Sequence, residues 1–509
     1  MTQAGPPESR PRSVAAPIVL LVLVGVLELI LFLSALASGA GAEDLPVLLL
    51  ALITVLVGAG PVLFNMVQSA HGRQILITLM AASWMVYIAV PVFTQYFLLR
   101  GVAVPGSFRL SSFAPGDVAH AQLVALLGLA MLLFGFYLPL GRLAASVIPK
   151  PSREWPASAA LVVGLLTLTF GWLVYIPGQL GLLPSRGGAA IMGTITSGSS
   201  FGIALLALTW LRHRRREALL LLAIVVPLAM LFNFFTGSKR LVLTPPFMIA
   251  LAYIVYERRI RVSWLAAGLA ALVVLYPLAN AYRVVVNPLR GGRFASFVQS
   301  PGQALERLSE ATQNVDFDSY VAQGLASTGS RLDGLGVLAQ IVKDTPERVP
   351  FQGGWTLGYI ALSYIPRIIW ADKPEMTIGI WVSQSYGDPN DPYTHVGPTW
   401  IGEFFFNFGY FGVGLGMFVL GFLARIAQER LFFWNATIPA LFGAVVVLYV
   451  TCRSVQGGVI DPVNGTIFTL WPILIAHYLV GLFSGYQRSG GGSRATGAAT
   501  GPAADRRVH

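Results

Sequence analysis

The chain contains about a dozen apolar runs, most of them close to twenty residues long, separated by short polar or basic segments. A helix needs about 20 predominantly apolar residues to cross the hydrocarbon core of a bilayer. The runs lie at 15–38, 46–67, 75–98, 119–140, 158–177, 199–211, 217–235, 241–256, 262–281, 399–424, 436–455 and 465–484. Because unpaired backbone groups are too costly in lipid, this pattern predicts an all-α polytopic membrane protein with about 12 transmembrane helices.

The composition points the same way. Of the 509 residues, 55% are hydrophobic and only 11% are charged, whereas soluble domains carry about 25% charged residues. The formal net charge is +11, but the basic residues are scattered between apolar runs and form no nucleic-acid-binding motif, so we expect no nucleic acid partner. The single Cys452 excludes an internal disulfide, and no Cys/His cluster has metal-ligand spacing, so we expect no metal and no other cofactor.

Basic residues alternate along the chain in the way that the positive-inside rule requires. With Arg10 and Arg12 in the cytoplasm, the loops that contain Arg73, RHRRR at 212–216 and ERRIR at 257–261 are also cytoplasmic. The predicted order is a cytoplasmic N-terminus at 1–14, helices one to nine at 15–281, a large extracytoplasmic loop at 282–397, helices ten to twelve at 398–485, and a disordered cytoplasmic tail at 486–509.

The large loop is too rich in charges and aromatic residues to be a simple linker. SPGQALERLSEATQNVDF, from Ser300, has a helix start and a helical spacing of Leu and Ala. GWTLGYIALSYIPRIIW, from Gly354, is apolar and aromatic, which fits a helix that lies in the membrane interface or dips into it.

Two basic segments on the predicted outer side indicate an anion site. YIPRIIWADKP in the loop contains Arg367 and Lys373, and TGSKR at 236–240 places Lys239 and Arg240 directly before an apolar run, against the charge pattern. Arginine suits phosphate because its planar fork donates two parallel N–H bonds. The alternative is that these long side chains snorkel to the interface from helix ends.

Further charged residues flank the same loop. Arg283 and Arg290 follow the ninth run, where they can neutralise a pyrophosphate or pair with carboxylates of the loop. His395 precedes the tenth run and has the chemistry of a proton acceptor for a hydroxyl group. Glu403 lies about one turn into that run, where a carboxylate is costly. The alternatives are a surface histidine and a capping or interhelical role for Glu403, with Asn407 as its hydrogen-bond partner.

Three segments together resemble a known family. FTGSKRLVL, YIPRIIWADKP and HVGPTWIGEFFFNFGYFGVGLGMFVLG are similar to segments of the O-antigen and exopolysaccharide polymerases of the Wzy type, the oligosaccharide repeat-unit polymerases. The resemblance implies a GT-C-like membrane glycosyltransferase in the cytoplasmic membrane of a bacterium, with its active site on the extracytoplasmic side. Its substrate would be an oligosaccharide repeat unit on undecaprenyl pyrophosphate.

The resemblance also implies roles and partners. His395 would be the catalytic base, with Glu403 second, and the substrate pyrophosphate would be bound by Lys239, Arg240, Arg283, Arg290, Arg367 and Lys373. Membrane lipid, a chain-length regulator and a flippase would be partners of such an enzyme. Three other functions stay open at this stage: an O-antigen ligase-like enzyme with a different acceptor, a lipid-linked sugar transporter, and a non-catalytic scaffold.

Overall fold

The structure, a computed structural model, is helical wherever it is described. It describes residues 41–68, 72–97, 108–183, 189–259, 293–313, 334–365, 369–370, 372–373, 378–391 and 394–490, together with positions 33, 268, 278 and 282. Within these residues all regular structure consists of α-, 3₁₀- or π-helix, and no strand occurs. The predicted fold class is therefore confirmed at the level of an all-α protein.

In the part of the chain that the structure describes, eight helices are long and apolar enough to cross a membrane. They are α2 (Leu45–Val67) with η1 (Ala42–Asp44) before it, α3 (Ile75–Trp84) continued by η3 (Met85–Ala89) and η4 (Val92–Phe97), α4 (Pro115–Tyr137), α6 (Ala157–Gln179), α8 (Arg216–Phe235), α9 (Lys239–Glu257), α17 (Thr399–Leu431) and α19 (Ile460–Gly490). In α9 and α19 the part that could cross a membrane is Arg240–Glu257 and Ile460–Leu482. Each coincides with one of the twelve predicted runs. The protein is a membrane protein with several long apolar helices.

The other four predicted spans have different outcomes. The runs at 15–38 and 262–281 lie outside the described residues, apart from three single positions. The run at 199–211 belongs to α7 (Ala189–His213), whose first half, TITSGSS at 194–200, is too polar for α7 to rank with the eight. The run at 436–455 forms α18 (Ile438–Ser454), which has only 17 residues.

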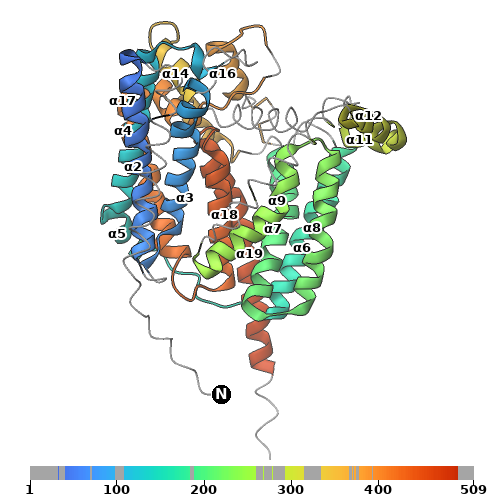
Figure 1. The fold of residues 1–509 in the computed structure, drawn as a ribbon. Helices are drawn as coiled ribbons and strands as arrows, with labels where there is room; N and C mark the ends of the chain where they lie inside the picture. Colours follow the sequence, from blue (N-terminus) through green and yellow to red (C-terminus); the bar gives the residue numbers. More distant parts are fainter. Residues whose placement is uncertain are drawn as a thin grey trace, which may run out of the picture.

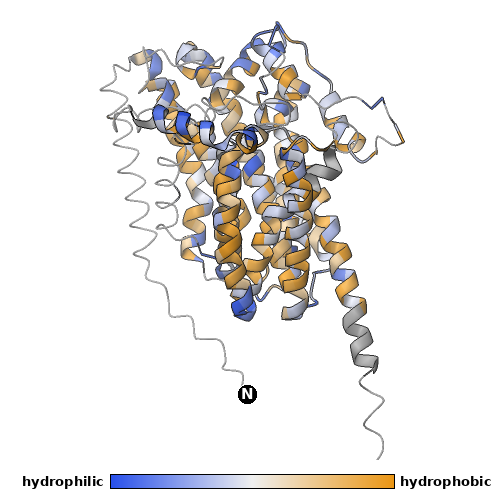
Figure 2. Cartoon of the chain, turned by 90° about the vertical axis from the view of Figure 1, so that its right-hand side faces the viewer, coloured by the Kyte–Doolittle hydropathy of each residue, from blue (hydrophilic) through white to orange (hydrophobic). Residues whose placement is uncertain are grey.

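The helices form a bundle whose middle is apolar and whose two ends are polar (Figure 1, Figure 2). Outward-facing leucines and aromatics along the bundle, such as Leu173, Leu220 and Phe411, are more than half exposed. Such exposure fits a lipid-facing surface, because in a bilayer the hydrophobic side chains need no protein cover. α18, by contrast, is buried along nearly its whole length.

Glycines let neighbouring helices approach until their backbones touch. A Cβ at Gly171 of α6 would overlap the backbone of Gly198 and Ser199 in α7, and one at Gly198 would lie 2.7 Å from the Thr167 oxygen. In the same way, Gly135 of α4 and Gly421 of α17 each face a backbone carbonyl of the other helix. Small residues at these crossings drive close packing in membranes, where lipid provides no hydrophobic force between helices.

α17 is two helices rather than one. Phe408 (φ −143°) and Gly409 (φ +61°) interrupt it, and a Cβ on Gly128 of α4 would touch both Ile401 and Met417. Those two residues would lie about 24 Å apart in a straight helix. The chain therefore doubles back at Gly409, so the predicted span at 399–424 is not one straight helix: residues 399–407 and 410–431 lie side by side.

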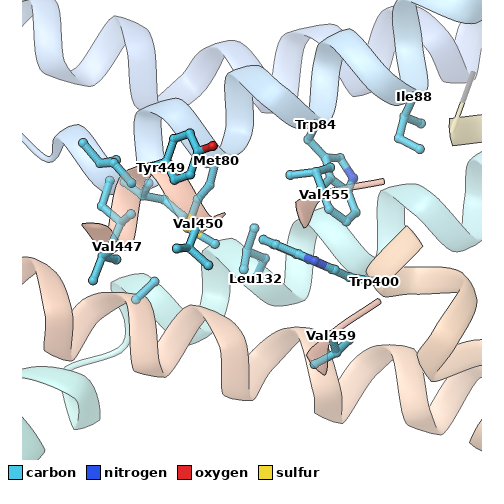
Figure 3. Packing of buried hydrophobic residues seen from close by; sticks show 14 of the residues in the cluster. Met80, Trp84, Ile88, Leu132, Trp400, Val447, Tyr449, Val450, Val455 and Val459 are labelled. Atoms are coloured by element: carbon cyan, nitrogen blue, oxygen red, sulfur yellow. The ribbon is translucent and has the colours of Figure 1, made fainter. Parts of the chain in front are cut away.

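The core beneath this hairpin is formed by aromatic and branched side chains. Trp84 of α3 and Trp400 of α17 are almost fully buried, and their ring centroids lie 6.0 Å apart. Val455 and Val459, which flank the turn between α18 and α19, pack beside them (Figure 3). The turn between α18 and α19 therefore packs directly on the hydrophobic core.

Most of the predicted basic loops gather at one end of the bundle, the basic end. Arg73 donates to the Arg258 carbonyl, Arg212 pairs with Glu154, and Arg153 donates to the Gly481 carbonyl. These contacts join loops that the positive-inside rule assigns to one side.

The helices of the predicted large loop pack at the opposite end. They are α11 (Arg293–Gln299), α12 (Pro301–Gln313), α14 (Gly334–Asp344), α15 (Trp355–Leu362) and α16 (Ile378–Tyr386). α11 packs on α6 and α8, α14 on α4 and α17, and α15 on α17 and α19 (Figure 1). The helix start predicted at Ser300–Pro301 is confirmed, while the side of the membrane stays a prediction.

Candidate functional site

Two carboxylates meet at the turn between α18 and α19, which contains Gly457 and Gly458. Glu403 Oε2 accepts a hydrogen bond from the Val459 N–H at 2.6 Å. A Cβ at Gly458 would lie 2.5 Å from the same oxygen, and one at Gly457 would lie 2.8 Å from Asp461 Oδ2. Both glycines are thus required for the carboxylates to approach the backbone this closely.

Two arginines share this site with Asp461. Arg453, in the last turn of α18, and Arg240, in the first turn of α9 (Lys239–Glu257), both lie within electrostatic range of the Asp461 carboxyl group. All three side chains are exposed. The site therefore presents two accessible cations and one accessible anion on the wall of an otherwise apolar bundle.

The α8–α9 turn that carries Arg240 is held by partly buried hydrogen bonds. Gly237 adopts φ +70°, a conformation that favours glycine, and reverses the chain. Asn233 Nδ2 donates to the Leu241 carbonyl at 2.9 Å, and the Tyr175 hydroxyl donates to Asn233 Oδ1 at 3.0 Å. The TGSKR segment thus enters α9 in one defined orientation.

Glu403 itself is completely buried, and Asn407 does not bind its carboxylate as predicted. Asn407 Nδ2 donates to the backbone oxygen of Glu403 at 2.8 Å and to Thr356 Oγ1 at 2.7 Å. Its Oδ1 accepts from the Gly354 N–H. The hairpin turn at Gly409 leaves carbonyls of the preceding helical turn without helical partners, and Asn407 binds one of them, that of Glu403. Asn407 therefore also joins the residues at the start of α15 to the α17 hairpin.

Tyr364 binds the start of YIPRIIWADKP to α19, and Lys373 folds back onto the residues around that start. Lys373 Nζ donates to the carbonyls of Ser363 and Ile365, just past the end of α15. The Tyr364 hydroxyl donates to Asn464 Oδ1 at 3.1 Å. Burial raises the pKa of Tyr364, which keeps its hydroxyl a neutral donor. Tyr364 thus contacts α19 about one helical turn after Asp461.

His395 lies on the approach to the same turn. Its side chain is exposed and lies against Gly379 of α16, where Val396 N–H donates to the Gly379 carbonyl. Gly397, two residues later, approaches the Gln456 carbonyl so closely that no Cβ would fit. Two residues span at most about 7 Å, so His395 is near the Gly457–Gly458 turn.

The remaining predicted site residues are not described in the same detail. Arg283, Arg290 and Arg367 lie outside the described residues, as does the side chain of Lys239. Their assignment to a pyrophosphate site stays a prediction.

Sequence reasoning missed Arg453 and Asp461. Arg453 sits at the predicted outer end of a span, so it breaks the positive-inside pattern as Lys239 and Arg240 do. That signal was available. Asp461 gave no comparable signal, because a carboxylate in an outer loop is ordinary and only the fold brings it to Arg240.

An apolar cavity opens beside the α8–α9 turn. Its volume is about 480 Å³, and its lining comes from α6, α8 and α11: Leu168, Trp172, Ile176, Val225, Leu228, Ala229, Leu231, Phe232, Phe235 and Phe294. Tyr175, between two of the lining residues, lies within electrostatic range of Arg240. The cavity therefore lies on the α6–α8 side of the turn that carries Arg240.

In the described part of the chain, no group of three or more His, Cys, Asp or Glu side chains is arranged to hold a metal ion. The described site offers arginine N–H donors, carboxylates and an imidazole.

Comparison with known proteins adds one finding. The profile of a domain of unknown function, DUF8712, matches residues 75–434, which is 360 of the 509 residues. The chain belongs to the DUF8712 family. The matched range of this DUF8712 member contains Arg240, His395 and Glu403, whereas Arg453 and Asp461 follow it. No curated protein and no solved structure matches the chain.

Proposed function

We propose that the chain is a membrane glycosyltransferase that polymerises lipid-linked oligosaccharide repeat units. It transfers the growing glycan from undecaprenyl pyrophosphate to the incoming repeat unit, at the extracytoplasmic face of a bacterial cytoplasmic membrane. One observation carries the proposal: Arg240 and Arg453 lie within electrostatic range of the same carboxylate, and the α8–α9 turn that carries Arg240 borders an apolar cavity. A polyprenyl pyrophosphate needs cations for its head group and an apolar surface for its tail.

The reaction requires two kinds of assistance. The acceptor hydroxyl oxygen bonds to the anomeric carbon while the bond from that carbon to the pyrophosphate oxygen breaks. Undecaprenyl pyrophosphate leaves with the bonding electrons, and the hydroxyl proton passes to a base. Because negative charge develops on the leaving oxygen, fixed cations nearby lower the barrier. Arg240 and Arg453 supply that charge in this proposal, together with the predicted Lys239, Arg283, Arg290 and Arg367.

Three residues are candidates for accepting or guiding the proton. His395 remains the first choice as base, since it is exposed and near the turn. Asp461 joins it as the exposed carboxylate between two arginines. Glu403, predicted as the second base, is 0% exposed and already binds the Val459 N–H. We assign it the positioning of the turn, and Lys373 the positioning of the segment before it.

The test is synthesis by the purified full-length protein in lipid nanodiscs. Lipid-linked repeat units from the source bacterium are supplied, and products are separated by length on a gel. A ladder of increasing length supports the proposal. Transfer of a single unit to a different acceptor, as a ligase would perform, contradicts it.

A transporter or a scaffold would give a different result. Neither would form a covalent product, and a transporter would move labelled lipid-linked units across proteoliposomes without elongating them. If the purified protein forms no glycan longer than the supplied repeat unit, although the lipid-linked substrate is intact, the proposal is overturned.

A further inference from the structure

A second charged site lies at the basic end of the bundle, away from the α18–α19 turn. It is a cavity of about 300 Å³, called here the arginine pocket, lined by Gly72, Arg73, Gln74, Arg142, Arg258, Arg425, Gln428, Glu429, Phe432, Phe433 and Trp434. These residues come from the start of α3, from α5 (Leu140–Ser146), from the end of α9 and from the end of α17. Four different parts of the chain thus converge on it.

The lining carries an excess of positive charge. Among the described residues that line the pocket there are four arginines and one carboxylate, that of Glu429. Arg425 Nη2 contacts Glu429 Oε1 at 2.6 Å, and Arg142 Nε lies 3.6 Å from the same oxygen. One carboxylate is therefore shared by two guanidinium groups.

Arg425 is the most buried of the four arginines. It is 3% exposed, and its Nε and Nη1 donors are buried without a hydrogen-bond partner. Its stem is confined by α5, since a Cβ on Gly141 would lie 2.7 Å from the Cβ and Cγ of Arg425. The side chain therefore cannot swing into water. Leaving donors of a buried cation unpaired is costly, so the arrangement favours an additional anionic partner.

Arg73 and Arg258 are fixed at the opposite wall by reciprocal bonds. Arg73 Nη1 donates to the Arg258 carbonyl at 2.5 Å, and Arg258 Nη2 donates to the carbonyls of Arg73 and Phe432 at 2.8 and 2.6 Å. Burial lowers the pKa of Arg258, the direction expected for a desolvated cation. A ligand meeting these groups finds them already oriented, which reduces the entropy cost of binding.

We propose that the arginine pocket binds a phosphate group. A phosphate carries up to two negative charges, which matches the excess of arginine, and its oxygens accept the paired N–H donors of guanidinium forks. The pocket, with a volume of about 300 Å³, is larger than a single carboxylate group would fill. Gln74 adds a side-chain amide whose Oε1 is buried without a hydrogen-bond partner; this amide can face a phosphate oxygen through its NH₂ group or a protonated phosphate through its oxygen.

Two sources of the phosphate share this chemistry. One is the head group of an anionic phospholipid, because basic pockets between membrane helices bind such head groups and the half-exposed Trp434 suits an interface. The other is a soluble phosphate compound. The site stands at the far end of α9 and α17 from the proposed glycosyltransferase residues, so it does not depend on that function.

The experiment uses the full-length protein in maltoside detergent, which contains no phosphate. Phosphatidylglycerol, the phosphate-free lipid monogalactosyl diacylglycerol, or inorganic phosphate at matched ionic strength is added. Native mass spectrometry then counts bound molecules, and thermal unfolding measures stabilisation. Retention of phosphatidylglycerol in preference to the galactolipid identifies a lipid source, and stabilisation by inorganic phosphate identifies a soluble one. If neither probe binds in preference to its control, the proposal is overturned.

Variants separate binding from a structural role. Arg425→Met removes the charge at similar length, and we expect the affinity for the bound probe to fall at least about tenfold. Without probe, Arg425→Met should be about as stable as the wild type, because a buried cation with two unpartnered donors has been removed and Glu429 keeps Arg142 nearby. The exposed Arg142→Gln should weaken the same binding without loss of folding.

Arg216→Gln is the matched control, because Arg216 is exposed at the basic end and does not line the pocket. It should bind like the wild type. Wild-type affinity for the probe in both Arg425→Met and Arg142→Gln would overturn the proposal. A loss of affinity in Arg216→Gln as large as that in the pocket variants would overturn it too.

Discussion

At the scale of single residues, the site depends on its glycines, which have no side chain, as much as on its charged residues. Gly457 and Gly458 leave room for two carboxylates, and Gly237 allows the turn that brings Arg240 to Asp461. Glu403 uses that room to hold the turn, while Asp461 and the two arginines stay exposed. The division separates residues that shape the site from residues available to a substrate.

Arg240→Ala and Arg453→Ala should each reduce ladder synthesis by about 10²-fold or more, since each removes a cation aimed at developing charge. Both variants should insert and unfold like the wild type, because both side chains are exposed. The measurement is the rate of glycan elongation by purified protein, with Arg216→Ala as the control. Wild-type rates in both variants would remove these arginines from the reaction.

Gly458→Ala should lower both stability and elongation, because the new methyl group would lie 2.5 Å from Glu403 Oε2. Overpacking of this kind costs about 1–3 kcal/mol. Thermal unfolding in detergent provides the measurement. Gly414→Ala in α17 is the control, since a Cβ there meets nothing within 4 Å. The penalty should shrink in a Glu403→Ala background; an unchanged penalty would mean that the two residues do not compete for space.

At the scale of elements, hydrophobic runs predicted most helices but not how two of them fold. The run at 399–424 has the length of one span, and GYFGVGLG contains no helix breaker as strong as proline. Only packing explains the reversal: Phe404 fits against Gly412 and Gly416, which no straight helix would allow. α7 was found only in part, because its polar first half is stabilised by contact with α6 rather than by its own hydropathy.

The α6–α7 crossing provides a test at this scale. Gly171→Ala should destabilise the protein by at least about 1–3 kcal/mol, because the methyl group would overlap backbone that cannot rotate away. Gly178→Ala in the same helix is the control, since its nearest neighbour would be Leu183 Cδ1 at 3.9 Å. Chemical or thermal unfolding compares the two. Equal stability of both variants would show that the helices are not in close contact.

At the scale of the whole molecule, the bundle has a basic end with the arginine pocket and an opposite end covered by α11 to α16. The positive-inside rule predicts that the basic end faces the cytoplasm. The apolar band between the two ends fits a bilayer (Figure 2). If the prediction is right, the site at the α18–α19 turn opens toward the outside.

Cysteine labelling tests this orientation. In a Cys452→Ser background the chain has no other cysteine, so single cysteines can be placed at exposed Asn390 and exposed Arg216. A membrane-impermeant maleimide should label Asn390→Cys in intact cells, and Arg216→Cys only after permeabilisation. The reverse pattern would place the proposed glycosyltransferase site in the cytoplasm and remove access to an extracytoplasmic substrate.

The sequence by itself determined that this is a helical membrane protein, because the length of apolar runs and the alternation of basic loops are local properties. It also identified Arg240 and Glu403 as charged residues at positions where a charge is unfavourable, on the predicted outer side and inside an apolar run. Only the tertiary structure decided that Arg240 and Arg453 lie within electrostatic range of Asp461, that Glu403 is buried behind a glycine turn, and that four arginines share a pocket at the basic end. Those relations join segments up to several hundred residues apart, and they depend on where glycines allow backbones to touch.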